Sequence, residues 1–88
     1  MTFEELTAKM NEIHSSKNSD YGDSFSKTLD EFGIVASATR MSDKFNRFKS
    51  LIKSSSKILV SDESVEDTLM DLACYSIMTI EWLKKHGV

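Results

Sequence analysis

The chain of 88 residues contains no proline and only three glycines. Proline is the residue that breaks helices most strongly, and glycine is the residue that most readily adopts a positive φ. With so few of either, nothing in the sequence forces a break inside a helix. The composition therefore predicts an all-α protein, and the length predicts a single domain over residues 1–88.

Hydrophobic residues make up 40% of the chain and charged residues 28%, as in ordinary globular domains. No apolar run approaches the roughly 20 residues that span a bilayer, and the acidic N-terminus does not resemble a signal peptide. The single cysteine, Cys74, excludes an intrachain disulfide framework. We therefore expect a cytoplasmic protein that has no membrane partner. Because a core of this size stabilises a fold only weakly, we also expect a homodimer or a higher homo-oligomer.

Apolar residues three and four positions apart predict the first helix, whose stripe consists of Phe3, Leu6, Met10 and Ile13. Thr2 and Glu5 have the spacing of a capping box at its start. Residues 15–24 are rich in Ser, Asn, Asp and Gly, whose side chains compete for backbone hydrogen bonds or favour turns. We expect the first helix to end by about residues 14–17 and a loop to follow it.

A short helix is predicted over Phe25–Phe32, with Gly33 ending it in a left-handed conformation. A long helix follows over about Ile34–Lys53. Its predicted core-facing stripe consists of Ala38, Met41, Phe45, Phe48 and Ile52. The last helix, about Glu63–Lys85, is apolar on two sides, which is typical of a helix at the centre of a bundle or dimer. Three main helices and one short helix predict a small antiparallel bundle completed by oligomerisation.

Charge is distributed unevenly along the chain, although the net charge is only −3. Residues 40–57 hold six basic side chains and one acid, whereas residues 61–71 hold five acids and no base. These segments could be complementary helix faces. They could equally be the two halves of a site for a phosphate ester and its metal.

The sharpest acidic pattern lies in the last helix, where Asp67 and Asp71 share one face and Glu63 extends the row by a turn. Carboxylates on adjacent turns suit Mg²⁺ or Mn²⁺. A solvated acidic face near a helix N-terminus is the commoner explanation of such a row. Asp71, however, has apolar neighbours, and a carboxylate in such surroundings needs a partner or a metal.

A second group, Arg40, Asp43, Lys44 and Arg47, shares one face of the preceding helix. Asp43 and Asn46 form an oxygen-ligand pair at a spacing of three. The cations suit phosphate, which arginine binds by bidentate hydrogen bonds and lysine as a point charge. Taken alone, the group is explained more simply as the solvated side of an amphipathic helix with internal ion pairs.

The third group is the polar segment of residues 17–25, in which Asp20 and Tyr21 beside a glycine could contact a base or a sugar. A plain turn with Tyr21 packed inward is equally compatible. His14 and His86 lack zinc-ligand spacing and are expected at the surface, and Cys74 is expected in the core. The overall acidity argues against direct DNA binding.

Three phrases together resemble a known family, the nucleotide-modification-associated domain of phages and bacteria. They are DYGDSF at 20–25, RMSDKFNR at 40–47 and DESVEDTLMDLACY at 62–75. The resemblance covers about residues 17–82 and implies a phage-type role in nucleotide metabolism, in the host cytoplasm if the chain is phage-encoded.

The third phrase is also similar to the acidic helix of MazG-like all-α nucleoside triphosphate pyrophosphohydrolases. Those dimers or tetramers hold Mg²⁺ around nucleotide phosphates with four acids from two antiparallel helices. By this resemblance Asp67 and Asp71 would be the acids of the later helix, and Asp43 the remaining acid of the earlier one. Where those enzymes have Glu-x-x-Glu, this chain has Asp43-x-x-Asn46, so one carboxylate is missing.

The sequence leaves open whether the chain is an enzyme. As a metal-dependent hydrolase, it would cleave a nucleoside triphosphate to a monophosphate and pyrophosphate. The metal (Mg²⁺ or Mn²⁺) would be held by Asp43, Asp67 and Asp71, with Glu63 or Glu66 as the catalytic base or a replacement ligand. The substrate would be contacted by Asp20, Tyr21, Arg40, Lys44, Asn46 and Arg47.

As a binding protein, the chain would hold a nucleotide in the same pocket without chemistry. It would then be a sensor, a sponge for nucleotide signals, or an accessory subunit of a nucleotide-modifying enzyme. A third interpretation has the charges form salt bridges between the helices of a small dimer.

Overall fold

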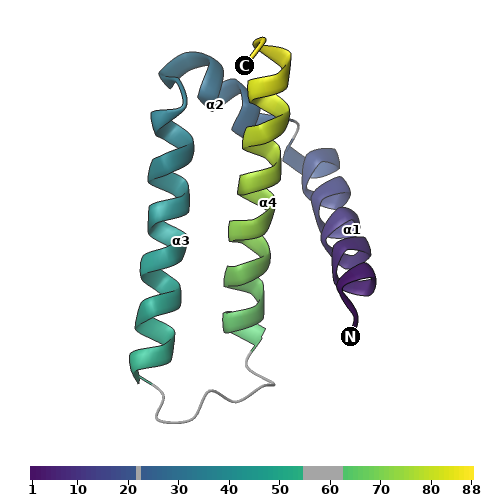
Figure 1. Cartoon of the computed structure of the whole chain (residues 1–88), viewed down its shortest axis with the longest axis vertical. Coiled ribbons are helices and arrows are strands. Elements are labelled where there is room, and N and C mark those ends of the chain that lie inside the picture. The colour runs from purple at the N-terminus through teal and green to yellow at the C-terminus, as the bar shows by residue number, and fades with distance from the viewer. Residues whose placement is uncertain (22, 55–62) are drawn as a thin grey trace.

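The computed structural model describes residues 1–21, 23–54 and 63–88, with side chains described for residues 1–18, 23–53 and 65–88. This part of the chain forms four helices and no strand, so the all-α prediction is confirmed (Figure 1). The helices are α1 (Phe3–Tyr21), α2 (Ser24–Phe32), α3 (Val35–Ser54) and α4 (Glu63–Lys85). In the described ranges, no helix has both the length and the apolar character needed to cross a bilayer.

Helix α4 lies at the centre of the arrangement (Figure 1). α3 runs antiparallel along one side of α4, and α1 packs against the other side. The short α2 lies across the end where α3 begins and α4 ends, and it contacts both. This central position explains why α4 is apolar on two sides, and α4 has the bounds that its sequence pattern predicts.

The interior of the bundle is small and partly polar. In the described part of the chain, Leu29 of α2 is the one apolar side chain that is fully buried. Ser37 of α3 and Thr68 of α4 are each only 2% exposed. The Ser37 hydroxyl shares a hydrogen bond with the Thr79 hydroxyl across the α3–α4 seam. A polar pair, Ser37 and Thr79, therefore lies between the two helices, at a place where aliphatic side chains are common.

Helix α1 continues to Tyr21, so the prediction that it ends by residues 14–17 is wrong. Its last turns contact α4: the Lys17 ammonium lies 3.1 Å from the Asp71 carboxylate, and the His14 ring lies beside the Cys74 thiol. Such contacts between helices outweigh the weak helix propensity of the Ser- and Asn-rich segment.

Helix α3 has nearly its predicted bounds, but a different face of it is turned towards α4. The side chains buried or half-buried along that face are Ser37, Met41, Lys44, Phe48 and Leu51. Of the predicted stripe, Ala38, Phe45 and Ile52 are exposed, with Phe45 at 49% and Ile52 at 37%. The helix is rotated because Ser37 and Lys44 both have polar partners on α4. The spacing of apolar residues does not reveal these polar partners, so it could not predict the rotation of α3.

The capping box and the end of α2 at Gly33 are confirmed, but the ψ of Gly33 is not that of the predicted left-handed conformation. The Glu5 backbone N–H donates to the Thr2 hydroxyl at 3.1 Å, and the Thr2 backbone N–H donates to the Glu5 carboxylate at 3.2 Å, which completes the capping box. Gly33 ends α2 with φ +80° and ψ −177°, and its N–H donates to the Leu29 carbonyl at 2.7 Å. That backbone conformation is essentially restricted to glycine.

Replacing Gly33 by alanine is expected to lower the free energy of unfolding by about 1–3 kcal/mol, the usual cost of holding a non-glycine residue in this conformation. The cost comes from backbone strain, since an added Cβ would meet no atom within 4 Å. Chemical denaturation of both proteins measures it.

Gly87→Ala is the matched control, because Gly87 also has a positive φ of +76° but precedes the last residue, where the chain can fray. It should cost only a few tenths of a kcal/mol. Equal stability of Gly33→Ala and the unsubstituted protein would contradict the strain argument.

Candidate functional site

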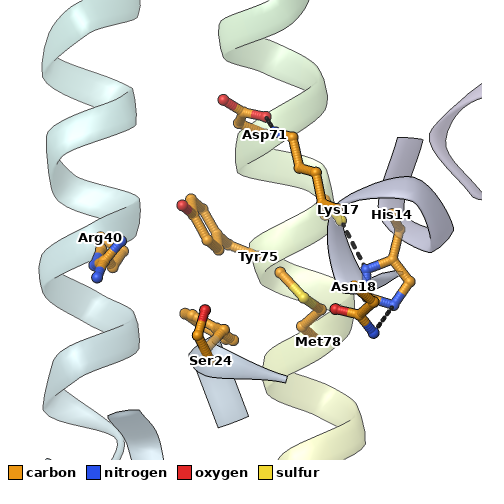
Figure 2. A pocket seen from close by; sticks show the side chains of 10 residues that line it. His14, Lys17, Asn18, Ser24, Arg40, Asp71, Tyr75 and Met78 are labelled. Atoms are coloured by element: carbon orange, nitrogen blue, oxygen red, sulfur yellow. Dashed lines mark hydrogen bonds and ion pairs between the residues drawn. The ribbon is translucent and has the colours of Figure 1, made fainter. Parts of the chain in front are cut away.

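A pocket of about 350 Å³ lies where all four helices come together (Figure 2). This volume is within the usual range for small-molecule sites. We call it the cationic pocket, and its lining residues are His14, Lys17, Asn18, Ser24, Phe25, Arg40, Asp71, Cys74, Tyr75 and Met78.

Helical spacing explains how α1 and α4 line the pocket. His14, Lys17 and Asn18 are three and four positions apart, so they share the face that the extended α1 turns towards α4. On α4, Asp71 and Tyr75 are separated by one turn, and Met78 follows after another. The pocket therefore depends on α1 continuing past residue 17.

Asp71 is the electrostatic centre of the site. Its carboxylate accepts a hydrogen bond from the Lys44 ammonium of α3 at 2.8 Å and another from the Lys17 ammonium of α1 at 3.1 Å. One carboxylate on α4 thus connects three helices. These two ammonium groups are the partners that a carboxylate in apolar surroundings requires.

The two ion pairs also determine the protonation state of the carboxylate. Partial burial raises the pKa of Asp71, but the hydrogen bonds from Lys44 and Lys17 lower it more, so the pKa lies below its ordinary value of 3.8. The hydrogen bond to Asp71 likewise raises the pKa of Lys17 above 10.5. Both groups are charged at neutral pH.

An aromatic wall and a further cation complete the pocket. The rings of Phe25 and Tyr75 lie 5.0 Å apart between centroids and are tilted by 35°. Arg40 reaches the pocket from α3 and Lys17 from α1, with Tyr75 between them in the view of Figure 2. Within the described ranges, Arg40 has no ion-pair partner. Its guanidinium is therefore available to an anion.

His14 and Cys74 lie together at the α1 side of the pocket. The Cys74 sulfur is 3.8 Å from the His14 Nδ1, and the His14 Nε2 is 3.4 Å from the Asn18 amide nitrogen. His14 is half-buried here, so the expectation that it lies at the surface is wrong. Burial raises the pKa of the Cys74 thiol above 9.0, which keeps it protonated and unreactive at neutral pH.

The predicted metal ligands are not brought together among the described residues. The side chains of Asp43 and Asp67 are exposed and do not line the cationic pocket, whereas Asp71 is held by two ammonium groups. In the described ranges, no group of three His, Cys, Asp or Glu side chains could hold a metal ion. The described carboxylates of one chain therefore do not fit a divalent cation.

The structure describes the side chain of only one of the two predicted catalytic glutamates. Glu66 pairs with Lys9 of α1 at 2.8 Å, outside the cationic pocket. The side chain of Glu63 lies outside the described residues, so its predicted role stays a prediction.

Of the predicted substrate contacts, Arg40 lines the pocket and Lys44 lies beside it, bonded to Asp71. Asn46 and Arg47 are exposed and do not line the pocket. The side chains of Asp20 and Tyr21 lie outside the described residues, so their predicted contacts stay predictions.

Sequence reasoning did not assign Lys17, Phe25 and Tyr75 as site residues. A signal for Lys17 was present, since Met10, His14 and Lys17 continue the stripe of the first helix at spacings of four and three. The polar composition of residues 15–24 concealed this continuation.

Replacing Asp71 by asparagine is expected to destabilise the fold by about 1 kcal/mol at pH 7, because two partly exposed ion pairs are lost. Since the folded-state pKa of Asp71 is below 3.8, this contribution is present above about pH 4 and disappears as the pH falls through the folded-state pKa. The stability difference between the two proteins should therefore shrink at pH 3. Urea denaturation at pH 7 and pH 3 measures it.

Glu66→Gln is the control for this experiment, because the Glu66–Lys9 pair is more exposed, at 46% and 40%. It should change stability by only a few tenths of a kcal/mol. If Asp71→Asn were as stable as the unsubstituted protein at pH 7, the ion pairs would not contribute as described.

Comparison with known families supports the resemblance seen in the sequence. The family model described as nucleotide modification associated domain 1 matches residues 17–82, which are 66 of the 88 residues. The matched range includes every lining residue of the cationic pocket except His14. Neither a curated protein nor a solved structure gives a significant match. The chain belongs to the family of nucleotide modification associated domain 1.

Proposed function

We propose that the chain binds a nucleotide in the cationic pocket and serves nucleotide modification as a binding protein. The observation that carries the proposal is the combination, in one pocket, of the Arg40 guanidinium, which has no ion-pair partner among the described residues, and the Phe25–Tyr75 aromatic wall. An anionic group joined to a planar aromatic one is the chemistry that such a pocket fits, and a nucleotide has both.

Charge around the pocket favours the phosphate end of the ligand. Among the described residues that line the pocket or bond to its lining, the cations Lys17, Arg40 and Lys44 outnumber the one carboxylate, Asp71. Arg40 can hold phosphate oxygens by two parallel hydrogen bonds, and Lys17 adds a point charge from the other side. Because Lys17 is 57% exposed, its ammonium can approach a ligand without losing Asp71.

The aromatic wall provides the contact for the base. Stacking of a base on an aromatic side chain contributes roughly 1–3 kcal/mol and tolerates different bases, since each has a π face. The Asn18 amide and the His14 ring line the same pocket and can hydrogen-bond the edge of a base or a sugar hydroxyl.

Binding without hydrolysis is the function that this geometry supports best. A pyrophosphohydrolase of the MazG type needs several carboxylates around a divalent cation, and Asp71 is already neutralised by two lysines. Asp43 and Asp67 lie outside the pocket. The hydrolase interpretation, with Mg²⁺ or Mn²⁺ as cofactor, is therefore the alternative that the experiment must distinguish.

Replacing Arg40 by glutamine is expected to weaken nucleotide binding roughly 10- to 100-fold, the value of one or two charge-assisted hydrogen bonds. Isothermal titration of a panel of ribo- and deoxynucleoside mono-, di- and triphosphates in the presence of chelator measures the affinity. A parallel assay of pyrophosphate release with Mg²⁺ tests for hydrolysis.

Arg47→Gln removes the same charge two turns further along α3, at a side chain that does not line the pocket. It should change affinity less than threefold. Loss of binding with Arg47→Gln but not with Arg40→Gln would place the ligand elsewhere on α3. Turnover that requires Mg²⁺, or failure of every nucleotide to bind, would overturn the proposal.

A further inference from the structure

The chain exposes more surface than a compact monomer of its mass. Its accessible surface is 6475 Å², whereas about 5,200 Å² is expected for a globular protein of 10.0 kDa. The radius of gyration is 14.3 Å, against roughly 12 Å for a compact domain of this length. With Leu29 as the one fully buried apolar side chain among the described residues, a single copy has little core.

Much of the missing core corresponds to an open apolar groove between the first half of α1 and α4. The groove has a volume of about 510 Å³ and is lined mainly by Phe3, Leu6 and Met10 of α1 and by Leu69, Met70 and Ile77 of α4. Its one charged lining residue, Glu66, is paired with Lys9. The lining is therefore almost entirely hydrocarbon.

Three apolar side chains of this groove are more exposed to solvent than is favourable for a chain that folds alone. Phe3 is 85% exposed, Ile77 46% and Leu69 41%. Ile80, one turn beyond Ser76 of the groove, is 55% exposed and extends the apolar surface along α4. A contiguous apolar surface of this kind marks an interaction site.

We infer that the apolar groove is covered by a second copy of this chain in a two-fold symmetric dimer, with Phe3 of each copy inserted into the groove of the other. A two-fold interface must be self-complementary, and this surface has both a projecting aromatic ring and an apolar hollow. The mainly hydrocarbon lining resembles the interfaces of obligate homodimers.

The amount of exposed surface also favours a second copy. The excess over a compact monomer is about 1,200 Å², and a standard interface buries about 800 Å² on each partner. Since one chain has so little core, the cover must be present whenever the chain folds. Another copy of the same chain satisfies that condition without a second gene product.

The mass of the unsubstituted protein in solution is the first test, measured by sedimentation equilibrium over a hundredfold range of concentration. A dimer is expected, and its melting temperature should rise with protein concentration because dissociation accompanies unfolding. A monomer whose melting temperature is independent of concentration would overturn the inference.

The location of the interface is tested by Phe3→Asp, which removes an aromatic ring that is already exposed in one chain. Because two-fold symmetry makes each substitution act twice, association should weaken at least about 100-fold. Phe32→Asp is the matched control, since Phe32 is 67% exposed at the end of α2 and does not line the groove. It should remain dimeric.

Circular dichroism of each variant checks its helix content. Loss of helix content together with dissociation in Phe3→Asp supports the inference, because the groove is then required for folding. A Phe3→Asp variant that remains a dimer, or a Phe32→Asp variant that dissociates, would place the interface on another face and overturn the inference.

Discussion

The Asp71 carboxylate and the two ammonium groups that hold it connect the three long helices of the structure. Lys44 comes from α3 and Lys17 from α1, at 2.8 and 3.1 Å, so one side chain of α4 is bonded to two other helices. Removing a carboxylate from water costs free energy that these two hydrogen bonds must offset. The hydrogen bonds from Lys44 and Lys17 lower the pKa of Asp71, whereas its burial raises it. Because few apolar side chains are buried among the described residues, such polar connections contribute to the geometry of the bundle.

The rotation of α3 follows from this constraint and has two consequences. Lys44 faces α4, so Phe45 and Ile52 are displaced to an exposed flank of the helix. Arg40, one turn before Lys44, is brought to the cationic pocket beside Tyr75. If α3 instead presented its most apolar face to α4, Lys44 would lose Asp71 and Arg40 would leave the pocket. The chain therefore retains the cationic pocket at the expense of apolar packing.

Local sequence signals predicted the number and bounds of most elements, because capping, glycine and periodicity act within a few residues. The Thr2–Glu5 capping box, the end of α2 at Gly33 and the full extent of α4 were all predictable in this way. The length of α1 and the rotation of α3 were not, since both involve contacts with distant residues of α4, such as Asp71, which is 54 residues from Lys17 and 27 from Lys44. The same cause explains the outcome for the site. Arg40 could be predicted as a site residue from the pattern of its own helix, whereas Lys17 and Tyr75 come to line the cationic pocket only through contacts between helices.

Helix α1 connects the cationic pocket with the apolar groove. Its first half lines the groove through Phe3, Leu6 and Met10, and its second half supplies His14, Lys17 and Asn18 to the pocket. Under the two proposals, a partner that covers the groove also fixes the helix that carries these pocket side chains. The entropic cost of ordering α1 would then be met by the first of the two binding events and would not oppose the second. Dimerisation and nucleotide binding should therefore raise each other's affinity by the same factor, as thermodynamic linkage requires. A bundle too small to hold its first helix firmly would in this way make its binding site respond to its own assembly.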